Sequence, residues 1–289
     1  MRKFFAGLIA SLFLFATGEA YAPEGQLYVT MLDVGQGESI LIETPSQNIL
    51  IDAGDISEKQ KLQSELEKAG VTRFERIILT HQHADHIGGM GMILDNYEVD
   101  EISDNGFSSA SPLYQRYRSA DVKFSTLREG DLISFGNGVV FEVLNPAVKS
   151  VRVNNDSVVG KLKFGDFKML ITGDIEREVE EELIASADIS ADVLDACHHG
   201  SITSCTEDFL GMVNAKVILI SAGKNNAYGH PHKKALRNMR LFGSDIYCTA
   251  FNGTIKVVSD GSSQFTVICD NQADWLEQYT GERVTYTRL

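Results

Sequence analysis

The sequence has little positive charge, and after its first residues it has no long apolar run. Its 26 Lys and Arg residues are outnumbered by 40 Asp and Glu residues, so the formal net charge is -14. This balance disfavours a protein that binds DNA or membranes mainly by electrostatic attraction, because affinity for phosphate backbones comes mostly from Lys and Arg. Nucleic acid remains possible as a substrate, since bound divalent cations would supply local positive charge.

The one long apolar run lies at the N-terminus. A basic start is followed by apolar residues from Phe4 to Ala16 and then by small residues up to Ala22. This order is typical of a secretory signal peptide, and the run is shorter than the roughly 20 residues that span a bilayer. We expect residues 1–20 to be a signal peptide, with cleavage after Ala20, and the mature protein to be exported to the periplasm or the extracellular space. If cleavage fails, the segment could act as a short membrane anchor; after cleavage no stable membrane insertion is expected.

Cysteine is scarce, with four residues: Cys197, Cys205, Cys248 and Cys269. An oxidising compartment permits disulfides, and four cysteines allow three pairings. Cys248 and Cys269 lie in strand-like segments that could be neighbours and could pair, and free thiols are an alternative. The sequence shows no feature that predicts a protein partner.

The chain lacks repeats, low-complexity tracts and any segment that reads as a linker between domains. Strand-like and helix-like segments alternate, which predicts an α/β domain over residues 24–270 followed by a more polar tail at 271–289. Strands are expected at 27–32, 39–43, 48–52, 75–79, 132–135, 139–144, 157–164, 167–172, 192–196, 216–221, 246–250 and 254–258. Helices are expected at 57–69, 87–94, 175–185, 207–212 and 233–242.

Histidine is absent except in three short clusters. The seven histidines are His81, His83, His86, His198, His199, His230 and His232. Scattered core or surface histidines would not group in this way. Neutral imidazole is the commonest metal ligand in proteins, so the clusters predict a metal centre once folding brings them together.

The first cluster reads His81-x-His83-x-Asp85-His86, with four ligand side chains within six residues. No regular helix or strand can point all four at one spot, but a tight loop can divide them between two metal ions. Asp174 follows a strand, and its two carboxylate oxygens could bridge the ions. With imidazole and carboxylate ligands zinc is the natural choice, and manganese or iron remain open. The expected cofactor is therefore two divalent metal ions.

This motif, followed by Ile87-Gly88-Gly89, resembles the signature of the metallo-β-lactamase superfamily. The resemblance covers nearly all of the mature chain and implies a four-layer αβ/βα sandwich with a dinuclear metal site at its edge. Further motifs resemble the C-terminal hydrolase domain of ComEC-type DNA-uptake proteins and their stand-alone relatives; exported phosphocholine esterases are more distant. These motifs are Leu32–Ser39, Ile51–Gly54, Leu170–Asp174, Ala191–Leu194, His198–Ser201 and Tyr228–His232.

The resemblance implies roles for individual residues. His81 and His83 would bind the first metal, Asp85 and His86 the second, and Asp174 would bridge them.

One departure from the broad superfamily is that no histidine occurs between residues 87 and 197. In the ComEC-like group the missing ligand is replaced by the pair that here is His198 and His199. We favour His198, because it shares strand alternation with Leu194 and Ala196, with His199 as the alternative. His230 would complete the second metal.

Two residues are candidates for catalysis. His232 would donate a proton to the leaving oxygen, and Asp85 is counted as catalytic as well as a ligand. Asp52 is expected to support the metal loop through hydrogen bonds rather than to bind metal. Asp33 and Gln36 either line the site or lie in a glycine-rich turn that only allows a tight hairpin.

We therefore expect an exported dinuclear metal-dependent hydrolase, a phosphodiesterase or nuclease that acts on DNA or related phosphodiesters. A metal-bound hydroxide would attack in line, with both cations stabilising the developing charge. The first alternative is hydrolysis of another ester, namely a phosphocholine ester, a lactone or a β-lactam. The second alternative is a metal- or DNA-binding module without turnover.

Overall fold

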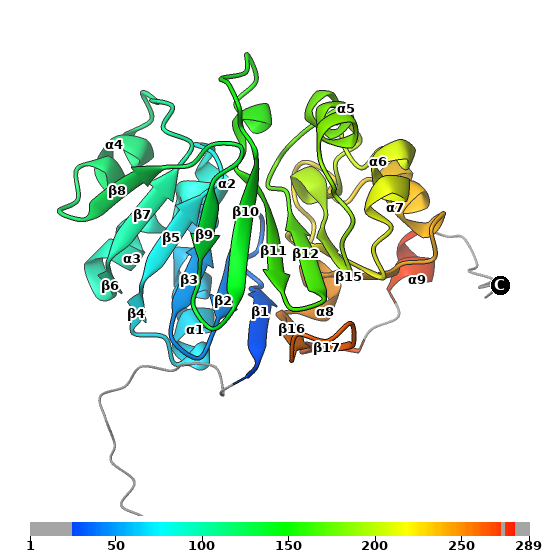
Figure 1. Ribbon diagram of the computed structural model, residues 1–289, viewed down its shortest axis with the longest axis horizontal. Coiled ribbons are helices and arrows are strands. Elements are labelled where there is room, and N and C mark those ends of the chain that lie inside the picture. The colour runs from blue at the N-terminus through cyan, green and yellow to red at the C-terminus, as the bar shows by residue number, and fades with distance from the viewer. Residues whose placement is uncertain (1–24, 273–274, 281–289) are drawn as a thin grey trace, which may run out of the picture.

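The computed structural model describes residues 25–272 and 275–280. The predicted signal peptide at 1–20 lies outside the described residues. The described chain forms two large mixed sheets that face each other, with helices on both outer faces (Figure 1). Within this part of the chain, no helix has the length and hydrophobicity needed to cross a bilayer.

The first sheet has eight strands in the order β17-β16-β1-β2-β3-β5-β7-β8. The strands from β17 to β3 are antiparallel neighbours, whereas β3, β5, β7 and β8 run parallel. A separate pair, β4 (Arg73–Phe74) and β6 (Glu98–Val99), is parallel. The strands of the large sheet are β1 (Leu27–Met31), β2 (Ile40–Glu43), β3 (Asn48–Ile51), β5 (Arg76–Leu79), β7 (Glu101–Asp104), β8 (Lys123–Thr126), β16 (Ile255–Ser259) and β17 (Phe265–Cys269).

The second sheet has seven strands in the order β15-β14-β13-β12-β11-β10-β9. The strands from β9 to β12 form an antiparallel meander, and β12 to β15 are parallel. Its strands are β9 (Leu132–Ser134), β10 (Val139–Asn145), β11 (Val159–Phe164), β12 (Phe167–Ile171), β13 (Val193–Asp195), β14 (Val217–Ile220) and β15 (Asp245–Cys248).

Three buried clusters define four layers. One lies between the sheets, and β10 shows why: Val139, Phe141 and Val143 are buried in it, while the residues between them are only half-buried. A second cluster joins the first sheet to α1 (Lys59–Ala69), α2 (Ala84–Ile87), α3 (Met90–Asn96) and α4 (Pro112–Arg118). A third joins the second sheet to α5 (Arg177–Ser186), α6 (Glu207–Val213), α7 (Lys233–Arg240) and α9 (Leu276–Thr280). The predicted αβ/βα sandwich is confirmed.

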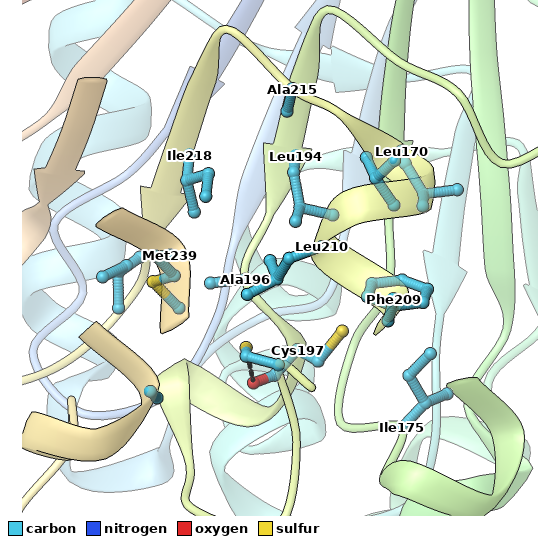
Figure 2. Packing of buried hydrophobic residues seen from close by; sticks show 14 of the residues in the cluster. Leu170, Ile175, Leu194, Ala196, Cys197, Phe209, Leu210, Ala215, Ile218 and Met239 are labelled. Carbon is cyan, nitrogen blue, oxygen red and sulfur yellow. Dashed lines mark hydrogen bonds between the residues drawn. The ribbon is translucent and has the colours of Figure 1, made fainter. Parts of the chain in front are cut away.

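The third cluster also anchors a turn that matters below. Figure 2 shows Leu194 and Ile218 of the second sheet packed near Leu210 of α6 and Met239 of α7. Cys197 lies in the same cluster and begins the 3-10 turn Cys197–Gly200, which carries two histidines. Burying such side chains contributes about 1.5–3 kcal/mol each, so the backbone of this turn is held at one end by the core.

Several local predictions need correction. The helix expected from residue 57 begins instead with a 3-10 turn, Ile56–Glu58, in which Asp55 accepts a hydrogen bond from the Ser57 N–H (2.8 Å). Gly70 ends α1 with a φ of 75°, as expected. The strand expected over 246–250 ends at Cys248, because the short helix α8 (Thr249–Asn252) follows at once.

The cysteine expectation is also resolved. All four cysteines are free, and Cys248 and Cys269 lie on strands of different sheets, β15 and β17, rather than on neighbouring strands. Of the polar tail expected at 271–289, the described part includes Trp275 and Leu276, which are buried in the third cluster. This part of the tail packs on the domain.

Candidate metal centre

The predicted ligands meet at one edge of the two sheets. The loop with His81 to His86 follows β5, Asp174 follows β12, the pair His198–His199 follows β13, and His230 lies in the loop after β14. These are carboxyl ends of strands, where loops from parallel neighbours converge.

Two groups of ligand atoms result, each with its atoms within 4.8 Å of one another: His81, His83 and Asp174 in the first, and Asp85, His86 and His199 in the second. The first histidine cluster is thus divided: His81 and His83 lie in one group, and Asp85 and His86 in the other.

Asp174 lies between the two groups, with one carboxylate oxygen facing each. Its Oδ2 is 3.7 Å from His81 Nε2 and 3.7 Å from His198 Nε2. Its Oδ1 is 3.2 Å from His86 Nε2 and 3.4 Å from His199 Nε2. A carboxylate placed in this way has the geometry to bridge two cations, with one oxygen for each.

The second group fits a cation because its buried ligand atoms lack other partners. Among the described residues, His86 Nε2, Asp174 Oδ1 and His199 Nε2 are buried without a hydrogen bond. The opposite nitrogen of each imidazole is occupied: His86 Nδ1 lies 2.6 Å from Asp52 Oδ2, and His199 Nδ1 lies 2.8 Å from the Ser221 carbonyl oxygen. These acceptors place the proton on Nδ1 and leave Nε2 as a lone-pair donor for a metal.

Asp52 also supports the histidine cluster at residues 81–86 through Thr80, the residue that precedes it. Its carboxylate accepts hydrogen bonds from the Thr80 N–H (2.8 Å) and the Thr80 hydroxyl (2.6 Å), and Thr80 directly precedes His81. Asp52 is fully buried and has a φ of 59°. It holds His86 and the start of the metal loop in one arrangement, which is the supporting role expected from the sequence.

The pair His198–His199 is placed differently from what strand alternation implied. β13 ends at Asp195, and both histidines adopt positive φ angles (50° and 56°) in the following turn, so the alternation of Leu194 and Ala196 does not extend to them. Both rings therefore face Asp174. His199 is buried and belongs to the second group, whereas His198 is half-exposed and faces the oxygen on the side of the first group.

His230 and His232 lie beside the centre rather than in either group. The His230 ring is 5.5 Å from that of His198 and 6.0 Å from that of His199. His232 is the residue before α7, and its Nδ1 accepts a hydrogen bond from the Ile202 N–H (3.0 Å). In neutral His232 the proton is then on Nε2, which is the form that can donate. The second group of ligand atoms thus contains His199, and His230 lines the cavity beside it.

Burial and neighbouring charges shift the titration of these groups. Burial lowers the pKa of His81 well below its usual value, and the nearby His86 lowers it further. Burial, together with His199 and His198, lowers the pKa of His230 to about 3. Burial alone would raise the pKa of Asp174, but His86 and His199 outweigh it and lower the pKa. Asp174 is thus held as a carboxylate and His81 as a neutral imidazole, the forms that bind metal.

A cavity of about 340 Å³ opens onto the centre. Apart from the ligand residues and from Ala84 and His230, it is lined by four polar residues, namely Gln36, Asp55, Asn154 and Tyr228. Among the described residues no Lys or Arg lines it. Asn154 and Tyr228 were not assigned from the sequence, because only the fold shows that their loops border the centre.

The glycine-rich turn both contributes a residue to the cavity and allows a tight approach of the backbone to the metal loop. Gln36 lines the cavity, whereas Asp33 pairs with Lys61 (2.5 Å) outside it. A Cβ at Gly37 would lie 2.3 Å from the Asp85 carbonyl oxygen, so glycine is required for the turn to approach the metal loop.

Comparison with known proteins agrees with this geometry. The family model described as "Metallo-beta-lactamase superfamily" matches residues 32–224. The chain belongs to this superfamily. It is 34% identical over 269 residues to ComE operon protein 3 of Bacillus subtilis (strain 168), with 85% of this chain and 34% of the relative covered. It is 31% identical over 238 residues to competence protein ComA of Neisseria gonorrhoeae, with 81% and 32% covered.

These relatives confirm the resemblance to ComEC-type proteins, and the chain spans about a third of their length. Among solved structures, the metallo-β-lactamase fold protein YhfI of Bacillus subtilis has a TM-score of 0.53 at 13% identity, covering 77% of this chain and 96% of that one. At this identity the likeness concerns the fold. Superfamily membership and the clustered histidines and aspartates make this chain a metal-dependent hydrolase of the metallo-β-lactamase type.

Proposed function

We propose that the protein is an exported phosphodiesterase with two metal ions, acting on DNA or related phosphodiesters. The observation that carries the proposal is Asp174, whose two oxygens face two separate sets of imidazole nitrogens at 3.2–3.7 Å. Paired cations are suited to displacement at phosphorus, because they stabilise both the attacking and the leaving oxygen. The names of the relatives, a competence protein among them, favour DNA as the substrate class.

In this proposal the first cation is held by His81, His83 and His198, and the second by Asp85, His86 and His199, with Asp174 shared. Zinc is the proposed metal, and manganese and iron are the alternatives to be compared. Bound in these groups, the metals would lower the pKa of water and offset negative charge on the phosphoryl oxygens.

Protein groups orient the ligating histidines and supply a hydrogen-bond donor. Asp52 fixes the tautomer of His86, and the Ser221 carbonyl oxygen fixes that of His199. Neutral His232 carries its proton on Nε2, because its Nδ1 accepts from Ile202 N–H, and it would donate a hydrogen bond to the leaving oxygen. Asp85 has a pKa below its usual value: burial opposes this, but the nearby His199 and His86 outweigh burial. It therefore stays ionised as a ligand.

The test is an activity panel with protein that has been stripped by a chelator and reloaded with zinc, manganese or iron. The substrates are single-stranded DNA, duplex DNA, bis-p-nitrophenyl phosphate, p-nitrophenyl phosphocholine, a β-lactam and a lactone. We expect metal-dependent cleavage of DNA and of bis-p-nitrophenyl phosphate, and none by Asp174→Ala. The matched control is Asp95→Asn, an exposed aspartate paired with Arg116, which should keep full activity. Hydrolysis confined to phosphocholine esters, lactones or β-lactams would move the assignment to another ester, and metal binding without turnover would favour a binding module.

A further inference from the structure

Tyr228 is an exposed aromatic side chain at the metal cavity that the proposed chemistry does not use. It lines the cavity together with His198, His199 and His230, and 62% of its surface is exposed. Its ring stacks on that of His230, with centroids 5.6 Å apart and an angle of 21° between the planes. One face of the tyrosine ring is thus covered by His230, which leaves the opposite face for another planar group.

The loop that carries Tyr228 is held in place by one side chain. Asn226 Oδ1 accepts hydrogen bonds from the Tyr228 N–H (3.1 Å) and the His230 N–H (3.0 Å). Asn226 Nδ2 donates to the carbonyl oxygens of Gly223 (2.9 Å) and His230 (2.6 Å). The tyrosine is therefore presented from a braced turn, and a ligand that stacks on it does not have to order a free loop.

The composition of the cavity limits what else could hold a substrate. Among the described residues no Lys or Arg lines it, and the chain as a whole has a formal net charge of -14. Extended contact with a phosphate backbone is therefore weak here. Base stacking on an aromatic ring does not need positive charge, and it tolerates any sequence because every base has a π-face.

We propose that Tyr228 forms a nucleobase subsite, in which the base next to the scissile phosphodiester stacks on the ring face that His230 leaves free. The inference rests on the proposed phosphodiesterase function and specifies its substrate as single-stranded or frayed nucleic acid. A base inside a duplex is already stacked and paired, so it cannot occupy the subsite without first being freed.

The kinetic test compares two substrates with the same leaving group, thymidine 5′-(p-nitrophenyl phosphate) and methyl p-nitrophenyl phosphate, on the metal-loaded full chain. Loss of stacking on one base corresponds to between about 5-fold and 150-fold in affinity. For Tyr228→Ala we expect kcat/KM to fall by this factor more on the thymidine ester than on the methyl ester, mainly through KM. Tyr228→Phe keeps the ring and should restore the preference. Leu241→Ala, a truncation of a side chain that is 63% exposed and does not line the cavity, should not change it.

Equal losses of kcat/KM on both esters would overturn the proposal, because Tyr228 would then act only by positioning His230. A Tyr228→Ala protein that loses no kcat/KM on either ester would overturn it as well. A binding experiment distinguishes failure of the nucleobase subsite from failure of the proposed phosphodiesterase function. Anisotropy of a labelled oligothymidylate, compared with an abasic strand of the same length, requires no turnover. Base-dependent binding that disappears in Tyr228→Ala supports the subsite even if no phosphodiester is cleaved, and equal binding of both strands by the unmodified protein refutes it.

Discussion

Replacing Asp52 by Asn tests how the metal loop is supported. Asp52 is buried and accepts three hydrogen bonds, two from Thr80 and one from His86 Nδ1. Asn keeps a single carbonyl oxygen, which the Thr80 N–H needs. Its amide NH2 then faces His86 Nδ1, where two donors oppose each other. The conflict is relieved if the His86 proton moves to Nε2, and a protonated Nε2 cannot bind a metal.

The size of the effect follows from this geometry. Losing the partner that orients a ligating histidine typically weakens metal affinity by about 10–100-fold, which is about 1.4–2.8 kcal/mol. We expect the loss mainly at the ion held by Asp85, His86 and His199. The first ion, at His81, His83 and His198, should be affected less, because Asp52 reaches His81 only through Thr80.

The assay is a competitive titration of metal-free protein against a chromophoric chelator, which resolves two affinities. Circular dichroism of the stripped variant checks that it remains folded. Asp95→Asn makes the same chemical change at an exposed site, where the side chain is 64% exposed, and should leave both affinities unchanged. An Asp52→Asn protein that is folded and binds both ions as tightly as the unmodified chain would refute the reasoning.

Four further predictions concern the metal ligands, a buried carboxyl group and the salt dependence of cleavage. Asp174→Ala should lower occupancy of both ions, measured by elemental analysis; loss of one ion with the other intact would refute the bridge. His199→Ala should weaken the second ion and His198→Ala the first, each by more than tenfold in the chelator titration, and mild, equal effects would show that the pair completes neither group. Burial raises the pKa of Glu43, and the nearby Lys256 partly offsets this rise. The carboxyl group therefore binds its proton more tightly in the folded protein than in the unfolded chain. It stabilises the folded state at pH values below its pKa in the unfolded chain, and this stabilisation is lost as the pH rises through its pKa in the folded protein. Glu43→Gln should thus gain melting temperature over the unmodified protein as pH increases from 4 to 8, and a gain that shrinks would contradict this. Finally, DNA cleavage should depend weakly on salt, because few phosphates are contacted; a steep slope of log affinity against log salt, near -0.9 for each of many phosphates, would contradict it.

Much of the fold could be predicted because its strands carry strong local signals. β10 to β12 form a meander of alternating and apolar segments, and the turn at Gly165 separates β11 from β12. The region from 97 to 131 could not be predicted. It contains α4 and β8, and β8 is half-exposed with the sequence Lys-Phe-Ser-Thr. Such a strand is defined by pairing with β7 rather than by its own pattern.

In the candidate site, too, some residues could be recognised from the sequence and others only from the fold. The first cluster and Asp174 could be assigned because their residue types and spacing already specify ligands. The placement of His198 and His199 depended on a turn with two positive φ angles, which no sequence alternation predicts. Tyr228 and Asn154 reach the cavity only through the packing of loops from distant parts of the chain.

The most direct test of a dinuclear phosphodiesterase is a metal titration followed by activity. Protein stripped with a chelator is reloaded stepwise with zinc, manganese or iron, and cleavage of bis-p-nitrophenyl phosphate and single-stranded DNA is measured at each step. We predict no activity in the stripped protein and a rise that levels off at about two ions per chain. Phosphodiester cleavage by the stripped protein, or saturation of activity at a single ion, would contradict the account.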